Sequence, residues 1–219
     1  IAEAFFHMSV VFRFLWRGKT LGRALFTEEI RKHVQGLSGR IVDLGSGRSP
    51  SYRAVLPSGI DYIATDYDLP SEQGLSIDLN KPLPFSDSSE RTILCFNTLY
   101  IIEDPDSLIR EVYRVLEKGG TFLLSSPLLW SEIPEPHDYN RFTAEGLERL
   151  LCRAGFSEVV VTRYGERFSV CANLLHPFLL TRLVRVPVYV LALWLDSLIP
   201  ARFRQEHPAP LGYFVVAKK

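Results

Sequence analysis

The sequence has 219 residues and a mass of 24.9 kDa, with 47% hydrophobic and 23% charged residues. This composition excludes a disordered chain, a collagen-like chain and a small disulfide scaffold, and the length fits one domain with an appendage. The formal net charge is zero, from 25 basic and 25 acidic residues, so a polycation that binds nucleic acid is not expected.

The charge is distributed unevenly along the chain. Residues 1–40 hold seven Lys and Arg against three Asp and Glu, and residues 168–219 hold six against two. Residues 41–167 hold 12 basic and 20 acidic residues. An acidic centre between two basic ends predicts three parts with different roles.

The three cysteines, Cys95, Cys152 and Cys171, are widely spaced and include no C-x-x-C pair. This pattern predicts reduced thiols in a cytoplasmic protein, with no disulfide framework and no metal site. No apolar run reaches the roughly 18 residues that a membrane-spanning helix requires.

From residue 40 onward, short apolar runs alternate with amphipathic stretches, as in an α/β domain with a parallel sheet. A short helix is expected around Tyr52–Leu56. The strands expected in chain order are Arg40–Leu44, Tyr62–Thr65, Leu75–Leu79, Thr92–Phe96, Thr121–Ser125, Glu158–Thr162 and Tyr213–Ala217.

Two longer helices are expected inside this alternation. Asp106–Glu117 places apolar residues at the spacing of one buried face, and the run Glu117-Lys118-Gly119-Gly120 is expected to end it. Thr143 is expected to cap a second helix that runs through Arg153 and stops at Gly155.

Two segments lie outside the alternation and define the expected domain organisation. Residues 1–36 predict an N-terminal helical cap that begins with an aromatic-rich helix. Residues 168–210 predict an apolar helical insertion before the last strand, broken into pieces by Pro177 and Pro187. Residues 37–167 together with 211–219 would then form the α/β domain.

The most informative motif is Asp43-Leu44-Gly45-Ser46-Gly47, where the first strand ends in glycines that allow the backbone to approach a ligand. As a G-x-G-x-x-G dinucleotide fingerprint it fails, because position 50 is Pro50. The carboxylate of Asp43 beside this turn suits a cationic ligand better than a pyrophosphate.

With this D-x-G-x-G motif the sequence resembles the class I S-adenosylmethionine-dependent methyltransferases, in particular the small-molecule group. Arg114-Val115-Leu116-Glu117-Lys118-Gly119-Gly120 matches the R-V-L-K-P-G-G scaffold run of that family. The resemblance covers about residues 37–165 and the last strand. It implies a Rossmann-like α/β fold with a seven-stranded sheet and S-adenosylmethionine as the cofactor.

The resemblance also implies which residues hold the cofactor. Asp66, at the end of the second strand, would bind the ribose hydroxyls, with Tyr67 on the adenine side. Asp78 and Leu79 would contact the adenine amine and ring. The remaining cofactor residues implied are Asp43, Gly45, Ser46, Gly47 and Asn97.

The loop after the fifth strand carries the candidate catalytic residues His137 and Asp138, within a run that resembles an H-D-x-x-R-F-T signature of the family. Histidine titrates near neutrality, and a neighbouring acid could orient it as a general base. The alternative is structural: His137, Asp138 and Arg141 would tie the loop to the next helix.

The sequence therefore predicts methyl transfer to a small or lipid-like acceptor. Two alternatives stay open: a catalytically silent regulatory module that binds the same cofactor, and an NAD-dependent oxidoreductase, which Asp43 and Pro50 disfavour. The basic, apolar ends admit a lid over the active site, a homodimer interface or peripheral contact with a membrane.

Overall fold

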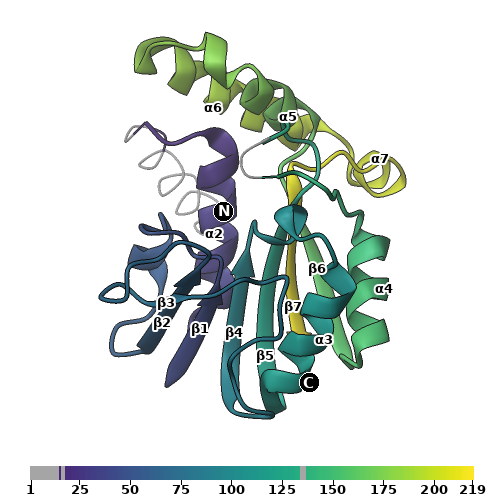
Figure 1. Ribbon diagram of the computed structural model, residues 1–219. Coiled ribbons are helices and arrows are strands. Elements are labelled where there is room, and N and C mark those ends of the chain that lie inside the picture. Colours follow the sequence, from purple (N-terminus) through teal and green to yellow (C-terminus); the bar gives the residue numbers. More distant parts are fainter. Residues whose placement is uncertain (1–14, 16–17, 134–136) are drawn as a thin grey trace.

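The computed structural model describes residues 15, 18–133 and 137–219 (Figure 1). Its centre is a seven-stranded sheet in the order β3-β2-β1-β4-β5-β7-β6. Neighbouring strands pair in parallel from β3 to β5, whereas β7 is antiparallel to both β5 and β6. The expected seven-stranded α/β architecture with a reversed last strand is confirmed.

The strands are close to those expected, and β1, β4, β5 and β7 bury apolar runs, whereas both residues of β3 are exposed. Their bounds are β1 Arg40–Leu44, β2 Asp61–Asp66, β3 Leu75–Ser76, β4 Glu90–Phe96, β5 Leu116–Pro127, β6 Glu158–Tyr164 and β7 Gly212–Lys218. The third strand is shorter than expected. A short 3-10 turn, η1 (Arg53–Val55), stands where a short helix was expected.

Helices cover both faces of the sheet. On one face, α3 (Pro105–Val115) and α4 (Ala144–Ala154) pack on the larger apolar core. On the other, α2 (Leu21–His33) packs through Phe26 and Ile30 on the second core. The capping prediction for α4 is confirmed: Thr143 accepts a hydrogen bond from Gly146 N, and Gly155 ends the helix in the left-handed conformation.

The expectation that Glu117–Gly120 ends the preceding helix is wrong. The helix α3 stops at Val115, and Leu116 is already the first residue of β5, paired with Glu90 of β4. Both Val115 and Leu116 are fully buried, so the chain turns into the sheet as soon as these side chains have entered the core. The glycine run lies in the first part of β5.

Between β6 and β7 the chain forms α5 (Arg167–Leu174), the 3-10 turn η3 (His176–Phe178), α6 (Arg182–Leu198) and α7 (Ala201–Glu206). Pro177 lies in the break between α5 and α6, as expected. The expectation that Pro187 also breaks the segment is wrong, because α6 continues through it. Pro187 is exposed, and burial of Val186 and Tyr189 outweighs the lost hydrogen bond.

A third apolar cluster attaches this insertion to the N-terminal part of the chain. It joins Leu21 and Ala24 of α2 to Ala172 of α5 and to Val186 and Tyr189 of α6. In Figure 1 α6 lies at the top of the molecule, beyond α2 and far from the sheet. The expected aromatic-rich first helix falls mainly on residues 1–14 and 16–17, which lie outside the described residues.

Candidate functional site

The candidate site lies where β1 and β4 stand side by side and their onward connections diverge, to β2 on one side and to β5 on the other. In open α/β sheets, ligands bind at such a point, outside the carboxyl ends of the strands. Here β1 ends at Leu44 and continues into Gly45-Ser46-Gly47, which we call the glycine corner.

Backbone geometry explains the first glycine of this corner. Gly45 has φ +70°, and a Cβ added there would lie 2.4 Å from Cγ2 of Thr98. Thr98 is the second residue after the end of β4 and follows Asn97. Thr98 is buried, and its hydroxyl donates toward the carbonyls of Leu44 and Gly45 at 3.3 Å. A side chain at Gly45 would force the two strand ends apart.

Asp66 is brought directly to the glycine corner. One carboxylate oxygen accepts a hydrogen bond from Gly47 N at 2.7 Å, and the other accepts from Tyr67 N at 2.8 Å. The side chain is half-buried, and each oxygen keeps a lone pair for a further donor. The ring of Tyr67 is 75% exposed, beside this carboxylate.

Asp43 is fully buried on the α2 side of the sheet. Its Oδ2 accepts hydrogen bonds from the hydroxyls of Tyr52 at 2.8 Å and Tyr62 at 2.5 Å, whereas Oδ1 has no partner among the described residues. Burial raises the pKa of Asp43 to about 6, although the two tyrosine hydroxyls act in the opposite direction. An unpartnered oxygen at such a site costs free energy unless a further polar or cationic group faces it.

Asp78 and Leu79 follow β3, which pairs with the end of β2. Ile77 N donates to the carbonyl of Asp66 at 2.8 Å, so this segment begins next to the ribose-binding candidate. Asp78 accepts a hydrogen bond from Asn80 N at 3.0 Å, and Lys81 Nζ lies 3.3 Å from its carboxylate. Both contacts lower the pKa of the Asp78 carboxyl. Leu79 is buried.

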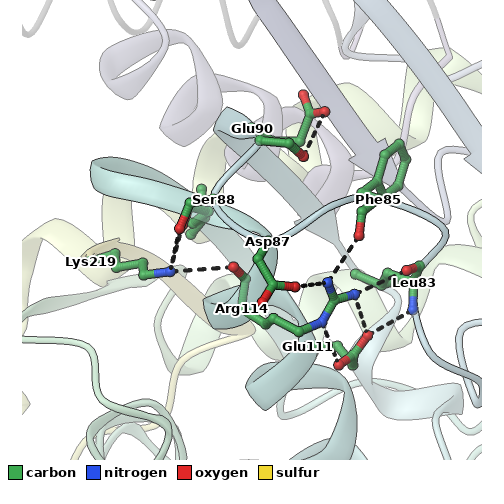
Figure 2. Close-up of polar contacts among 10 residues, drawn as sticks. Leu83, Phe85, Asp87, Ser88, Glu90, Glu111, Arg114 and Lys219 are labelled. Carbon is green, nitrogen blue, oxygen red and sulfur yellow. Dashed lines mark hydrogen bonds and ion pairs between the residues drawn. The ribbon is translucent and has the colours of Figure 1, made fainter.

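Arg114 of α3 forms hydrogen bonds and an ion pair with residues 83–87, in the segment that follows Asp78 (Figure 2). Arg114 pairs with Glu111 at 2.8 Å and Asp87 at 2.6 Å, and it donates to the carbonyls of Leu83 and Phe85 at 3.0 Å. These acids raise the pKa of the Arg114 guanidinium. The family-like run that begins at Arg114 therefore holds the loop that follows the adenine-side residues.

A cavity of about 350 Å³ opens at the glycine corner. Its lining includes Gly45, Ser46 and Asn97, and Asn97 has φ +51°. The backbone N–H of Asn97 donates to the hydroxyl of Ser125 at 3.0 Å, and that hydroxyl donates to Oδ1 of Asn97. The structure thus brings the first glycine motif and Asn97 to one cavity wall.

The rest of the lining is largely aromatic and was not anticipated as a site from the sequence. The rings come from α2, from the ends of β4 and β6, and from the segments after β1, β4 and β5: Phe26, Tyr52, Phe96, Tyr100, Trp130 and Tyr164. Among the described lining residues, Arg23 of α2 alone carries a charge. No local motif marks these residues, because they meet only when the sheet and α2 are assembled.

His137 and Asp138 are neighbours in sequence, but Asp138 is engaged elsewhere. Its carboxylate forms a two-pronged ion pair with Arg141 and accepts from Ile133 N at 2.9 Å. Arg141 holds the pKa of Asp138 below its usual value. The exposed ring of His137 stacks on Tyr139 with 5.0 Å between centroids. These contacts favour the structural alternative for Asp138, whereas a base role for His137 stays a prediction.

Comparison with protein families gives one domain match. Residues 42–124, from the third residue of β1 to the ninth residue of β5, match the family described as "Methyltransferase domain". The match contains Asp43, the glycine corner, Asp66 and Asp78. Among curated proteins, no relative matches this sequence.

Solved structures with the same fold are numerous and distant in sequence. A SAM-dependent methyltransferase from Archaeoglobus fulgidus aligns with a TM-score of 0.61 at 17% identity, over 95% of this chain and 98% of the other. One from Thermotoga maritima gives 0.59 at 16% identity, over 100% and 96%.

Phosphoethanolamine N-methyltransferase 2 from Haemonchus contortus, in complex with S-adenosyl-L-methionine, gives a TM-score of 0.56 at 15% identity. The alignment covers 89% of this chain and 52% of that one. The fold is thus that of class I methyltransferases. The domain match at residues 42–124 lies within this fold.

Proposed function

We propose that this protein transfers the methyl group of S-adenosylmethionine to a small or lipid-like acceptor bound in the aromatic cavity. The observation that carries the proposal is the position of the cavity. It opens on the glycine corner, and the carboxylate of Asp66 is bonded to the same corner at Gly47. Donor and acceptor would therefore meet at the carboxyl ends of β1 and β4.

The residues present fit the donor. Gly45 and Gly47 have positive φ, and at Gly47 the backbone of the corner is open, since nothing lies within 4 Å of a Cβ built there. Asp66 would accept from the ribose hydroxyls, and Asp78 with Leu79 and Tyr67 would line the adenine. Asp43, Ser46 and Asn97 would face the methionine part, where the carboxylate of Asp43 complements a positive charge.

When bound, S-adenosylmethionine supplies an electrophilic methyl group on a positively charged sulfur. The protein then needs mainly to hold the acceptor in line with that group and to exclude water. The rings of Phe96, Tyr100 and Trp130 suit this task, since they are rigid and present apolar surface. Arg23 would favour an acceptor that carries an anionic group near the cavity wall.

The proposal is tested with donor labelled in its methyl group, incubated with separate aqueous and organic extracts of small metabolites and lipids. Label is expected in a product of one extract, and it should require intact protein. If label enters neither extract while S-adenosylhomocysteine binds, the silent binding module becomes the correct assignment.

Donor binding is tested separately with Asp66→Ala. Calorimetry should show S-adenosylhomocysteine binding weakened by about 1–3 kcal/mol, because hydrogen bonds to a charged group are lost. The control is Asp68→Ala, which removes a carboxylate that is 86% exposed and paired with Arg48 at the surface. Equal affinity of Asp66→Ala and the wild type would place the ribose elsewhere.

A further inference from the structure

The helix α6 presents apolar side chains to solvent. Leu183 is 79% exposed, Leu191 is 52%, Trp194 is 56% and Leu198 is 59%. With Pro187, which is also exposed, they follow one another at spacings of three or four residues, so they lie on one face of the helix. We call this set the α6 outer face.

The charged side chains of α6 do not share this face. Asp196 is buried and accepts from Phe168 N at 2.8 Å and Ser169 N at 3.0 Å, at the start of α5. Arg185 donates to the carbonyl of Leu179 at 3.1 and 3.0 Å. A helix that packs on a protein and faces water has the opposite arrangement, with its polar side chains outside. The α6 outer face is therefore built for contact with something apolar.

The exposed apolar surface extends past the start of α6, and basic residues flank it. Phe178 and Leu180, just before the helix, are 79% and 83% exposed. Arg182 is at its first position, and Arg202 follows its end with a side chain that is 88% exposed and paired with Glu206 at 2.8 Å. Between these two arginines the one acidic residue is Asp196, which is turned inward. The surface thus combines apolar side chains with the positive charge of Arg182 at the start of the helix.

The dimensions of the α6 outer face decide between a second protein copy and a membrane. A helix of 17 residues is about 25 Å long and about 10 Å wide, which gives a strip of roughly 250 Å². A stable protein interface needs roughly 800 Å² from each partner. A helix at a bilayer surface needs only such a strip, with apolar side chains among the headgroups and Arg at its edge. Among the described residues, no helix has the length and apolar character to cross a membrane.

We propose that the α6 outer face, with Phe178 and Leu180, docks this methyltransferase on the surface of a bilayer that contains anionic lipid. The inner face of α6 packs on α2 through Tyr189 and Leu21, and the adjacent face of α2 lines the cavity with Arg23 and Phe26. Docking would bring the cavity close to the lipid headgroups. The link between this surface and the methyl acceptor rests on the proposed function. The docking of the α6 outer face on a bilayer does not depend on it.

The test is sedimentation of the full chain with vesicles of phosphatidylcholine, with and without phosphatidylglycerol, at low salt. We expect binding that increases with phosphatidylglycerol and falls about tenfold or more in Trp194→Glu or Leu183→Glu. Arg182→Gln should weaken binding about fivefold on the anionic vesicles alone. The matched control is Val160→Glu, at a position on β6 that is 58% exposed, which should bind as the wild type does.

Each result has one meaning. Absence of wild-type binding to anionic vesicles would overturn the proposal, and so would equal losses in Trp194→Glu and Val160→Glu. A dimer in lipid-free buffer that Trp194→Glu dissociates would assign the face to a second copy instead. Binding of S-adenosylhomocysteine, measured on every variant, reports folding and the donor site separately, so a failure of docking is distinguished from a failure of the proposed function.

Discussion

Asp43 combines two roles that oppose each other. In the proposed function its carboxylate would complement a positively charged donor, but the folded chain buries it completely, and the hydroxyls of Tyr52 and Tyr62 only partly compensate. Burial of both tyrosines raises their pKa values, so they remain hydrogen-bond donors at neutral pH. The native protein without ligand therefore carries a pH-dependent cost at this residue.

The sign and size of that cost can be measured with Asp43→Asn. The pKa of Asp43 is about 6 in the folded chain against 3.8 for an unperturbed aspartate, so between these values the folded state holds the proton more tightly. As the pH rises through this window, the free energy of unfolding of the wild type should fall by about 3 kcal/mol, since one pKa unit is about 1.36 kcal/mol.

Asp43→Asn lacks this titration, so its stability relative to the wild type should rise by that amount from pH 4 to pH 7. Urea unfolding at several pH values is the measurement, and Asp68→Asn, at an exposed carboxyl, is the control. Parallel curves for the wild type and Asp43→Asn would contradict the prediction.

At the level of single residues, the sequence predicts the acids and glycines at the strand ends, but it does not predict which side chains form hydrogen bonds with them. Asp66 and Gly47 are 19 residues apart, and the family resemblance placed both at strand ends, where the structure bonds them. Tyr62 could not be predicted as a partner of Asp43, because their contact depends on the register in which Asp43 pairs with Ala64. Register follows from the whole sheet and not from a local motif.

Among the elements, the junction of β1 and β4 is the most constrained, since Gly45 has no room for a side chain. Gly45→Ala should lower the free energy of unfolding by more than the roughly 1–2 kcal/mol of left-handed strain, because its Cβ would collide with Thr98. It should also abolish binding of S-adenosylhomocysteine. Thermal denaturation and calorimetry measure these two effects.

Gly59→Ala is the matched control. Gly59 has φ +80°, close to that of Gly45, but nothing lies within 4 Å of its added Cβ. Its loss should be the conformational strain alone. Equal losses in the two variants would mean that Thr98 moves aside at little cost.

The ends of helices were predictable from the sequence where capping residues set them. They were not predictable where tertiary packing sets them. The cap at Thr143 and the stop at Gly155 are local, and both were correct. The end of α3 is set by the burial of Val115 and Leu116, which overrides the glycines that follow. The continuity of α6 through Pro187 is likewise decided by tertiary packing.

On the scale of the whole molecule, α6 is attached by the third apolar cluster and by the hydrogen bonds of Asp196 to α5. Asp196→Ala removes both acceptors for the first turn of α5, at an expected cost of about 1–3 kcal/mol. Hydrogen exchange of the α5 and α6 amides should become faster by about tenfold or more, while exchange in β1 and β4 stays unchanged.

Ser197→Ala is the neighbouring control, because the Ser197 hydroxyl donates only to the carbonyl of Trp194 within the same helix. Faster exchange throughout the sheet in Asp196→Ala would instead make α5, α6 and the sheet one cooperative unit. The sequence alone does not reveal this attachment, since α6 is apolar on two sides and its periodicity does not distinguish the packed side from the exposed one.

The antiparallel pairing of β6 with β7 has a consequence for how this fold can change in evolution. Tyr164 at the end of β6 is paired with Gly212 at the start of β7, so the excursion from 165 to 211 leaves and re-enters the sheet at adjacent points. A lineage could lengthen, replace or discard that excursion as a hairpin loop without breaking a ladder or moving Asp43 and Asp66. Under the proposed function, the acceptor and the docking surface could then change while the residues proposed to hold the methyl donor keep their positions.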